Sequence, residues 1–146
     1  CGNGGSAATA SHFVCDMMKC ASHETRGRFR IVSLVDTVPT LTAFANDVAY
    51  AAVFSEPLRH LAQPDDLLMV LSGSGNSPNV VAAVEQANAA GLKTIALTGR
   101  DGGKLGKLAQ LHLHVADPHM GRIEDSHMVI CHMICYHFME HDGLAA

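Results

Sequence analysis

Residues 1–13 read CGNGGSAATASHF and residues 72–79 read SGSGNSPN, and in both stretches a turn of small residues leads into a helical pattern. Glycines let the backbone approach an anion closely, and the first-turn amides of the following helix point toward it. The helix dipole favours negative charge at the same place. A single turn of this kind also occurs as an ordinary strand-to-helix connection in α/β domains. Two such turns predict that a phosphorylated small molecule is held between them.

Alternating apolar and helical patterns predict the architecture around these turns. Runs rich in β-branched residues or leucine predict buried parallel strands, at residues 30–35, 67–72, 93–98 and 110–115. Helical patterns lie between and after the strands, at residues 7–19, 39–46, 48–61, 79–90 and 121–140. Strands alternating with helices predict a parallel sheet covered by helices on both faces. Ligands of such sheets bind beyond the carboxyl ends of the strands, where both glycine-rich turns are expected.

Length and composition limit the classes of protein that are possible. The 146 residues predict a single domain over residues 1–146, and the scattered basic residues with a formal net charge of -4 argue against nucleic-acid binding. No apolar run is long enough to span a bilayer, so we expect a cytoplasmic protein without a membrane partner. The five cysteines are odd in number and lie mostly in apolar helical segments, which predicts free thiols.

The first glycine-rich turn opens the chain, although a turn of the CGNGGS type follows a strand. We therefore expect this chain to be truncated at its N-terminus, with the first strand of the sheet and the helices before it missing.

Five motifs, in order along nearly the whole chain, identify a family that this sequence resembles. They are CGNGGSAATASHF, FANDVAY (residues 44–50), SGSGNSPNV (72–80), ALTGRDGGKL (96–105) and RIEDSHMVICH (122–132). Together they resemble the sugar isomerase (SIS) domain family, in particular its phosphoheptose isomerases. The resemblance implies a three-layer αβα sandwich around a five-stranded parallel sheet, assembled as a homotetramer with active sites between subunits.

The resemblance also implies an activity. Phosphoheptose isomerases interconvert sedoheptulose 7-phosphate and D-glycero-D-manno-heptose 7-phosphate through an enediol, and so feed heptose into lipopolysaccharide or other glycoconjugates. The implied partner is a small phosphosugar, and no nucleotide cofactor is expected. The residues implied to hold the phosphate are Ser72, Gly73, Ser74 and Ser77. The residues implied to line the sugar are Asn3, Gly4, Ser6 and Asp47, with Thr98 near the same pocket.

Two helices of the sequence each offer an imidazole and a carboxylate for acid–base chemistry. An aldose–ketose isomerase needs a base that moves a proton between two carbons and a group that moves protons between two oxygens. His12 and Asp16 are four residues apart and share a helix face. Glu124 and His132 are eight apart, which separates them by only about 80° around a helix. We expect His132 and one of the two acids, Asp16 or Glu124, to be catalytic.

The same four residues also form a plausible zinc set. Resemblance to the family places a His and a Glu at the positions of His12 and Asp16, and a Gln and a His at those of Glu124 and His132; some members bind zinc there. Two imidazoles and two carboxylates suit tetrahedral zinc. The set departs from the family at Asp16, which is shorter than Glu, and at Glu124, which adds a charge. These residues could act with a bound zinc ion or without any metal, and the sequence leaves both mechanisms open.

Three functions agree with the sequence. The first is isomerisation of a heptose 7-phosphate, and the second is isomerisation of a different phosphosugar. The third is a non-catalytic SIS protein that binds a sugar phosphate to sense it or to regulate another protein, like a replication-initiation factor that resembles the isomerases. Both imidazoles persist here beside two acids, which favours an enzyme.

Overall fold

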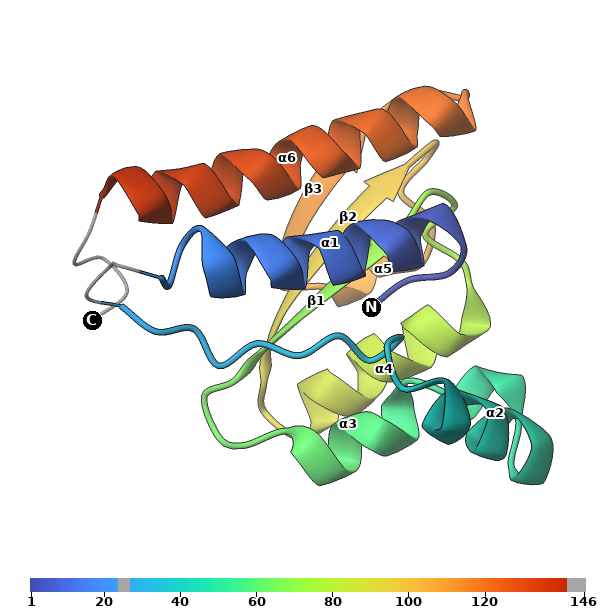
Figure 1. Ribbon diagram of the computed structural model, residues 1–146. Coiled ribbons are helices and arrows are strands. Elements are labelled where there is room, and N and C mark those ends of the chain that lie inside the picture. Colours follow the sequence, from blue (N-terminus) through green and yellow to red (C-terminus); the bar gives the residue numbers. More distant parts are fainter. Residues whose placement is uncertain (24–26, 142–146) are drawn as a thin grey trace.

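The computed structural model describes residues 1–23 and 27–141, and it places helices on both faces of a parallel sheet (Figure 1). The helices are α1 (Gly5–Lys19), α2 (Val38–Asp47), the 3-10 turn η1 (Tyr50–Ala52), α3 (Ser55–Leu61), α4 (Pro78–Ala89), α5 (Leu105–Leu108) and α6 (Met120–Glu140). The strands are β1 (Leu67–Ser72), β2 (Lys93–Gly99) and β3 (Leu111–Val115).

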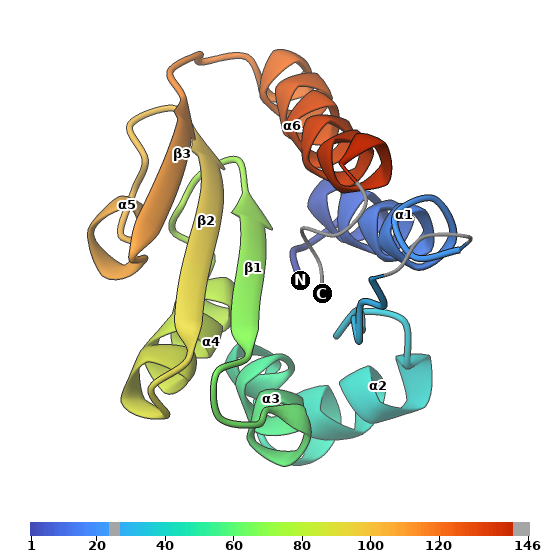
Figure 2. The ribbon, with the colours of Figure 1, turned by 90° about the vertical axis from the view of Figure 1, so that its left-hand side faces the viewer.

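The strands lie in the order β1, β2, β3 and are all parallel, with Leu67 opposite Lys93 and Ile95 opposite Leu111. Figure 2 shows α1 and α6 on one side of this sheet and α3 and α4 on the other. Both faces are therefore covered, as continuous apolar strands require. On β1 the neighbours Val70 and Leu71 are almost completely buried and belong to the two opposite cores.

The predicted αβα arrangement with a parallel sheet is confirmed, and three of its strands lie within the described residues. The strands predicted at 67–72, 93–98 and 110–115 agree with β1, β2 and β3 to within one residue at each end. Ser77 and Pro78 begin α4 as predicted. The helix ends before Gly91, whose φ of 77° is accessible to glycine, and Leu92 N donates to Ala87 O at 2.9 Å.

The strand predicted at residues 30–35 is wrong. Residues 28–33 have no regular structure, and a cavity of about 440 Å³ lies between this segment and the outer edge of β1. Phe29 and Ile31 line one side of the cavity, and Leu67 and Met69 of β1 line the other. A strand forms only when its backbone pairs with a neighbour. The apolar pattern shows that these residues face a core, but it does not supply the partner.

The single helix predicted over residues 48–61 is also wrong, because the chain forms η1 and α3 instead. Pro57 has no backbone N–H, so it interrupts any helix that continues through this position. It is accommodated in the first turn of α3, where an N–H would lack an intrahelical acceptor in any case.

All five cysteines are free thiols, as predicted. Over residues 1–23 and 27–141, no helix is both long enough and apolar enough to cross a bilayer.

Candidate active site

The first glycine-rich turn needs glycine at Gly2 for a close approach and at Gly4 for its backbone conformation. A Cβ on Gly2 would lie 2.7 Å from both Leu71 O and Ser6 Cβ, and Gly4 has a φ of 55°. Cys1 extends alongside β1, since Leu71 N donates to Cys1 O at 2.9 Å. The turn therefore leaves the sheet beside the end of β1 and enters α1, whose first-turn amides face this edge.

The second glycine-rich turn joins β1 to α4. Ser72 is buried, and its hydroxyl accepts a hydrogen bond from Gly75 N at 3.2 Å and lies 3.5 Å from the Ser77 hydroxyl. Asn76 N donates to the Ser74 hydroxyl at 3.2 Å. Backbone amides and hydroxyls thus gather at the N-terminus of α4, an arrangement that suits a phosphate.

A third turn, residues 99–106, packs on the second. Lys104 N donates to Asn76 Oδ1 at 3.0 Å, and Leu105 N donates to Gly75 O at 3.0 Å. Gly75 has a φ of 64°, and a Cβ there would overlap with the backbone of Gly102. The two turns therefore hold one fixed relative position.

A reciprocal pair of amides joins the first and second turns. Asn3 Nδ2 donates to Asn79 Oδ1 at 2.8 Å, and Asn79 Nδ2 donates to Asn3 Oδ1 at 2.8 Å. The Tyr50 hydroxyl also donates to Asn3 Oδ1, at 3.0 Å. Asn79 is only 1% exposed, so these hydrogen bonds link the two turns at a largely buried position. Sequence reasoning missed Asn79, because an Asn in the first turn of a helix has no distinctive pattern.

The other residues implied to bind the substrate have varied surroundings. Ser6 is buried at the start of α1, next to Gly2, and Asp47 is exposed at the end of α2, where its Oδ1 accepts from Asn46 Nδ2 at 2.7 Å. Thr98 is fully buried, and its hydroxyl lies 2.6 Å from His112 Nε2. Burial, together with the neighbouring His114, lowers the pKa of His112. The Thr98 hydroxyl is therefore paired with His112 of β3, and its contact with a sugar stays a prediction.

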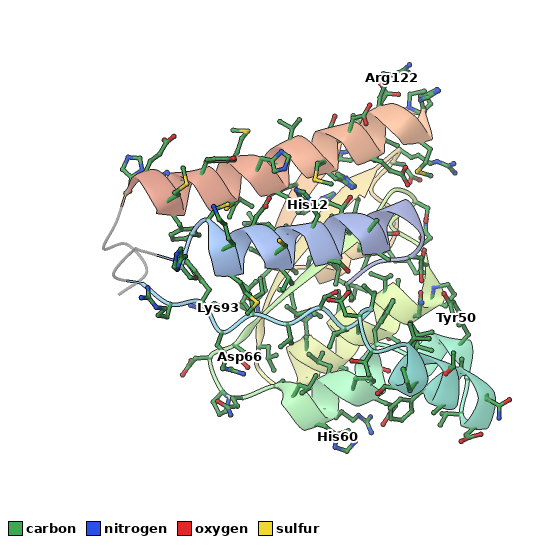
Figure 3. All side chains as sticks on the ribbon, in the orientation of Figure 1. His12, Tyr50, His60, Asp66, Lys93 and Arg122 are labelled. Carbon is green, nitrogen blue, oxygen red and sulfur yellow. The ribbon has the colours of Figure 1, made fainter. Side chains whose placement is uncertain are left out.

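Three of the four predicted metal-site residues meet between α1 and α6, and Figure 3 shows His12 on α1 reaching into this space. His12 Nε2 and His132 Nε2 are 3.2 Å apart, and Asp16 Oδ2 lies 3.3 Å from the first and 3.6 Å from the second. The side chains of His12 and His132 are 49% and 41% exposed, so the cluster is open to solvent. It is a possible metal-binding group.

Glu124 does not join this cluster within the described residues. Although Glu124 and His132 share a helix face, their positions are eight apart, which corresponds to a rise of about 12 Å along α6. Its carboxylate lies instead over the first turn of α1, where a Cβ on Gly5 would come within 2.6 Å of Oε1. The predicted set thus divides in two. His12, Asp16 and His132 form a triad farther along the two helices, and Glu124 lies at the glycine-rich edge of the sheet.

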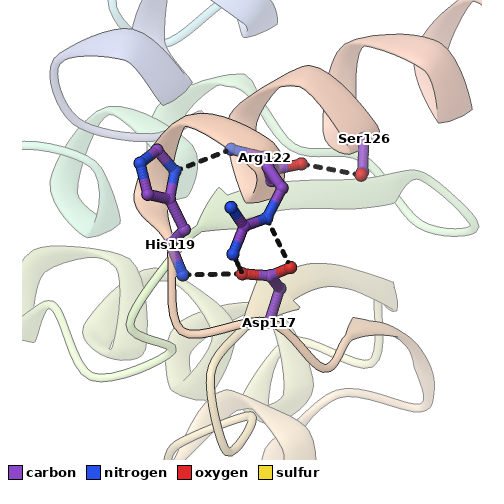
Figure 4. Close-up of polar contacts among 4 residues, drawn as sticks. All are labelled: Asp117, His119, Arg122 and Ser126. Carbon is purple, nitrogen blue, oxygen red and sulfur yellow. Dashed lines mark hydrogen bonds and ion pairs between the residues drawn. The ribbon is translucent and has the colours of Figure 1, made fainter.

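The start of α6 is fixed by a compact set of polar contacts (Figure 4). Arg122 donates to both carboxylate oxygens of Asp117 at 2.7 Å, and these hydrogen bonds lower the pKa of Asp117 to about 2. His119 N donates to the same carboxylate at 2.7 Å, and His119 Nδ1 accepts from Arg122 N at 3.4 Å. Arg122 is therefore paired with Asp117, and α6 is held so that Ile123 packs on Gly99.

His127 lies in the core of the protein, as an isolated histidine on a helix often does. It is 1% exposed, and within the described residues neither ring nitrogen has a hydrogen-bond partner. Burial lowers the pKa of His127, while the nearby backbone of Thr98 and the charge of Glu124 oppose this change. The ring is thus part of the packing between α6 and β2.

Comparisons with known proteins identify the family of this chain. The SIS domain family matches residues 1–99. A phosphoheptose isomerase of Aliarcobacter butzleri is 44% identical over 135 residues, which cover 92% of this chain and 71% of that protein. The chain belongs to the phosphoheptose isomerase family of SIS domain proteins.

Another member of this family, from Azoarcus sp. (strain BH72), is 40% identical over 138 residues, covering 92% of this chain and 70% of that protein. The solved phosphoheptose isomerase of Neisseria gonorrhoeae superimposes with a TM-score of 0.89 at 38% identity, over 97% of this chain and 74% of that one. Family membership therefore rests on sequence and fold together.

Proposed function

We propose that this protein is an aldose–ketose isomerase that interconverts sedoheptulose 7-phosphate and D-glycero-D-manno-heptose 7-phosphate through an enediol. The observation that carries the proposal is the placement of His12, Asp16 and His132 on two helices, α1 and α6, that both begin at the glycine-rich edge of the sheet. An extended sugar phosphate then has an anion site at one end and acid–base groups toward the other. The product supplies heptose for glycoconjugates such as lipopolysaccharide. The proposed location of the protein is the cytoplasm, where free thiols such as its five cysteines persist.

The anionic end of the substrate binds at the second glycine-rich turn. The hydroxyls of Ser72, Ser74 and Ser77 and the amides near Gly73 offer donors at the N-terminus of α4. Asn3, Gly4 and Ser6 form the adjoining first turn, which the Asn3–Asn79 pair holds beside it. The sugar hydroxyls therefore face this turn, with Asp47 and Thr98 as further candidates.

Acid–base catalysis is assigned to His132 and one of two carboxylates. Asp16 lies 3.6 Å from His132 and is the acid within reach of it, while Glu124 lies over the first turn of α1. One group moves a proton between C1 and C2, and the other moves protons between their oxygens. Asp16→Asn and Glu124→Gln show which of the two acids is the base. Substitution of the base should abolish proton exchange at carbon. Substitution of the other acid should weaken substrate binding or metal retention instead.

The triad suits zinc. A tetrahedral zinc ion with bonds of about 2.1 Å keeps its ligand atoms about 3.4 Å apart, and the three separations here are 3.2, 3.3 and 3.6 Å. His12, Asp16 and His132 would hold the ion, and an open position would face the solvent-exposed side. Bound there, zinc would polarise a sugar oxygen as a Lewis acid. In its present position, over the first turn of α1, Glu124 is not a ligand of this set.

A zinc-binding measurement tests this ligand set. Loss of a ligand in His12→Ala should weaken zinc binding by about 100-fold or more, because even residues that only support metal ligands contribute about 10- to 100-fold. The matched control is His60→Ala, because His60 is an exposed histidine of α3 (Figure 3). This substitution should leave the zinc affinity unchanged. Equal zinc affinity in the two variants, measured by competition with a chelator, would contradict the assignment.

The protein is proposed to assemble as a homotetramer with active sites between subunits. The outer faces of α1 and α6 expose large apolar side chains: Met18 is 57%, Val129 56%, Met133 67% and Tyr136 46% exposed. Tyr136 lies one turn after His132 on α6, and the centroids of the two rings are 6.4 Å apart, so this exposed apolar surface adjoins the triad at Tyr136. A second copy covering this patch would both bury it and enclose the triad.

Proton exchange tests the activity directly. The protein is incubated with sedoheptulose 7-phosphate in deuterated water, with and without zinc, and deuterium at C1 and C2 is followed by NMR. We expect exchange and product formation, and His132→Ala should reduce turnover by about 10²- to 10⁴-fold while sugar-phosphate binding persists. Binding without exchange in the unmodified protein would reject the enzyme and favour a non-catalytic sugar-phosphate sensor.

A further inference from the structure

The carboxylate of Glu124 lies directly above the first residue of α1. A Cβ on Gly5 would be 2.6 Å from Oε1, 2.8 Å from Cδ and 2.9 Å from Oε2 of this side chain. Gly5 is exposed, and α1 and α6 lie side by side and begin at the same end of the pair (Figure 1). The carboxylate therefore lies at the N-terminus of α1, on the open glycine-rich edge of the sheet.

The two helices that follow the first and second glycine-rich turns differ in what lies at their N-termini. Neither has an acidic residue in its own first turn, and neither has a side-chain hydrogen bond from its N-cap residue, which is Gly4 for α1 and Ser77 for α4. At α1 a carboxylate comes from another helix, on Glu124. The turn before α4 has the hydroxyls of Ser72, Ser74 and Ser77 instead. One turn thus has an acid and the other has neutral donors.

The Glu124 carboxylate has no partner of its own. Among the residues that the structure describes, none forms a hydrogen bond or an ion pair with it. Arg122, two residues earlier on α6, donates to both carboxylate oxygens of Asp117 instead. A carboxylate only accepts hydrogen bonds. It can therefore bind the hydroxyl groups of a sugar, whereas it repels a phosphate.

The similarity of the two turns creates a need for such a residue. Both lead into helices, and the amides and dipole of a helix N-terminus attract an anion. The hydrogen bonds between Asn3 and Asn79 hold the two turns next to each other. With neutral groups at both turns, a phosphate would have two neighbouring places to bind. A carboxylate at one of them leaves the turn before α4 as the favoured place.

From this placement we propose that Glu124 is a specificity-determining residue that restricts the substrate to sugars with a single phosphate. The inference rests on the proposed function, in which the phosphate binds before α4 and the sugar hydroxyls face the turn before α1. Glu124 accepts hydrogen bonds from these hydroxyls, and its charge opposes a second phosphate at the carbonyl end of the sugar. Specificity of this kind depends on a repulsive group as well as on attractive ones.

The test compares two ligands by calorimetric titration of the protein after removal of metal with a chelator. The ligands are sedoheptulose 7-phosphate and sedoheptulose 1,7-bisphosphate, and the measured quantity is the ratio of their dissociation constants. The unmodified protein should bind the monophosphate about 10-fold or more tightly than the bisphosphate, because like charges placed side by side oppose binding. Glu124→Gln keeps the shape of the side chain without its charge, and it should reduce this ratio about 10-fold, through tighter binding of the bisphosphate.

Asp125→Asn is the matched control. Asp125 is the next residue on α6 and is exposed, so this substitution removes the same charge from the same helix at a position that does not contact α1. Charges at the surface are screened over about 8 Å at physiological ionic strength. The control should therefore leave the ratio of the two dissociation constants unchanged. Circular dichroism of both variants checks that they fold like the parent.

Several outcomes would overturn the inference. They are an equal ratio in Glu124→Gln and in the parent, an equal fall of the ratio in Asp125→Asn, and tight binding of the bisphosphate by the parent. Failure of the proposed function is a separate result, seen as absence of deuterium exchange in sedoheptulose 7-phosphate. Selective binding of the monophosphate without exchange would reject the isomerase and support the role of Glu124. Exchange with an unchanged ratio in Glu124→Gln would keep the isomerase and reject this role, and binding of neither ligand would reject both.

Discussion

Replacing Gly75 by alanine tests whether the second and third glycine-rich turns form one rigid unit. Gly75 has a φ of 64°, and a Cβ at this position would lie 2.6 Å from Gly102 C and 3.1 Å from Gly103 Cα. These neighbours are backbone atoms and cannot rotate away. The substitution therefore combines a strained backbone with a clash that pushes the two turns apart.

The expected magnitude follows from these two effects. A non-glycine residue in the left-handed region costs about 1–2 kcal/mol. Forcing a methyl group into packed surroundings costs about 1–3 kcal/mol more. Together Gly75→Ala should lower the free energy of unfolding by about 2–5 kcal/mol. Separation of the turns also weakens the hydrogen bond from Leu105 N to Gly75 O.

Gly91→Ala is a matched control for the strain alone. Gly91 has a φ of 77°, and a Cβ there would meet no atom within 4 Å. This control should lower the free energy of unfolding by about 1–2 kcal/mol and leave ligand binding unchanged, because Gly91 lies at the far end of α4.

Urea unfolding followed by circular dichroism measures both variants, and calorimetric titration with sedoheptulose 7-phosphate measures binding. Gly75→Ala should be the less stable variant and should bind the sugar phosphate more weakly. If Gly75→Ala and Gly91→Ala lost the same stability, the close approach of the two turns would not constrain the fold, and the reasoning would be refuted.

Three further predictions concern single side chains. Asn79→Ala removes two buried hydrogen bonds to Asn3, so it should lower the free energy of unfolding by about 1–3 kcal/mol in urea and weaken sugar-phosphate binding in the same titration. His127 has a pKa below 6.5 in the folded protein, so the unfolded chain takes up its proton first and stability falls as the pH drops below 6.5. His127→Leu should flatten this fall in urea unfolding at pH 5 to 8, and an unchanged slope would contradict the burial argument. Asp117 has its pKa lowered from 3.8 to about 2, so its pairing with Arg122 stabilises the fold above pH 4, and this contribution is lost between pH 4 and 2. Asp117→Asn should therefore show a smaller change of stability over that interval than the parent does.

The sequence predicts most of the sheet because β1 and β2 have buried residues on both faces, whereas β3 is only partly buried. Residues 67–72, 93–98 and 110–115 are short apolar runs ended by glycine or polar turns, and their length and flanking residues favour strands over helices. Residues 30–35 have the same composition but lie beside a cavity at the edge of β1. Hydrophobic pattern reports which residues face a core, whereas a strand also depends on a neighbouring backbone, which composition does not encode.

Site prediction succeeds where the chemistry is local and fails where it depends on rise along a helix. The spacing of His12 and Asp16 places both on one face within one turn, and the structure joins them to His132. The spacing of Glu124 and His132 gives the same face but a separation of about 12 Å. Asn79 was not predicted, since its role depends on Asn3, which is 76 residues away in sequence.

The division of the two acids between the ends of the helix pair explains how this chain can carry a carboxylate where the family resemblance implies a neutral amide. Glu124 lies over Gly5, and Asp16 lies eleven residues farther along α1, a rise of about 16 Å. Two charges at that separation repel by about 0.3–1 kcal/mol for dielectric constants between those of a protein surface and water. Glu124 moreover lies at the N-terminus of α1, where the helix dipole favours a negative charge. The two carboxylates thus have separate surroundings: Asp16 lies next to two imidazoles, and Glu124 lies next to the turn proposed to face the sugar.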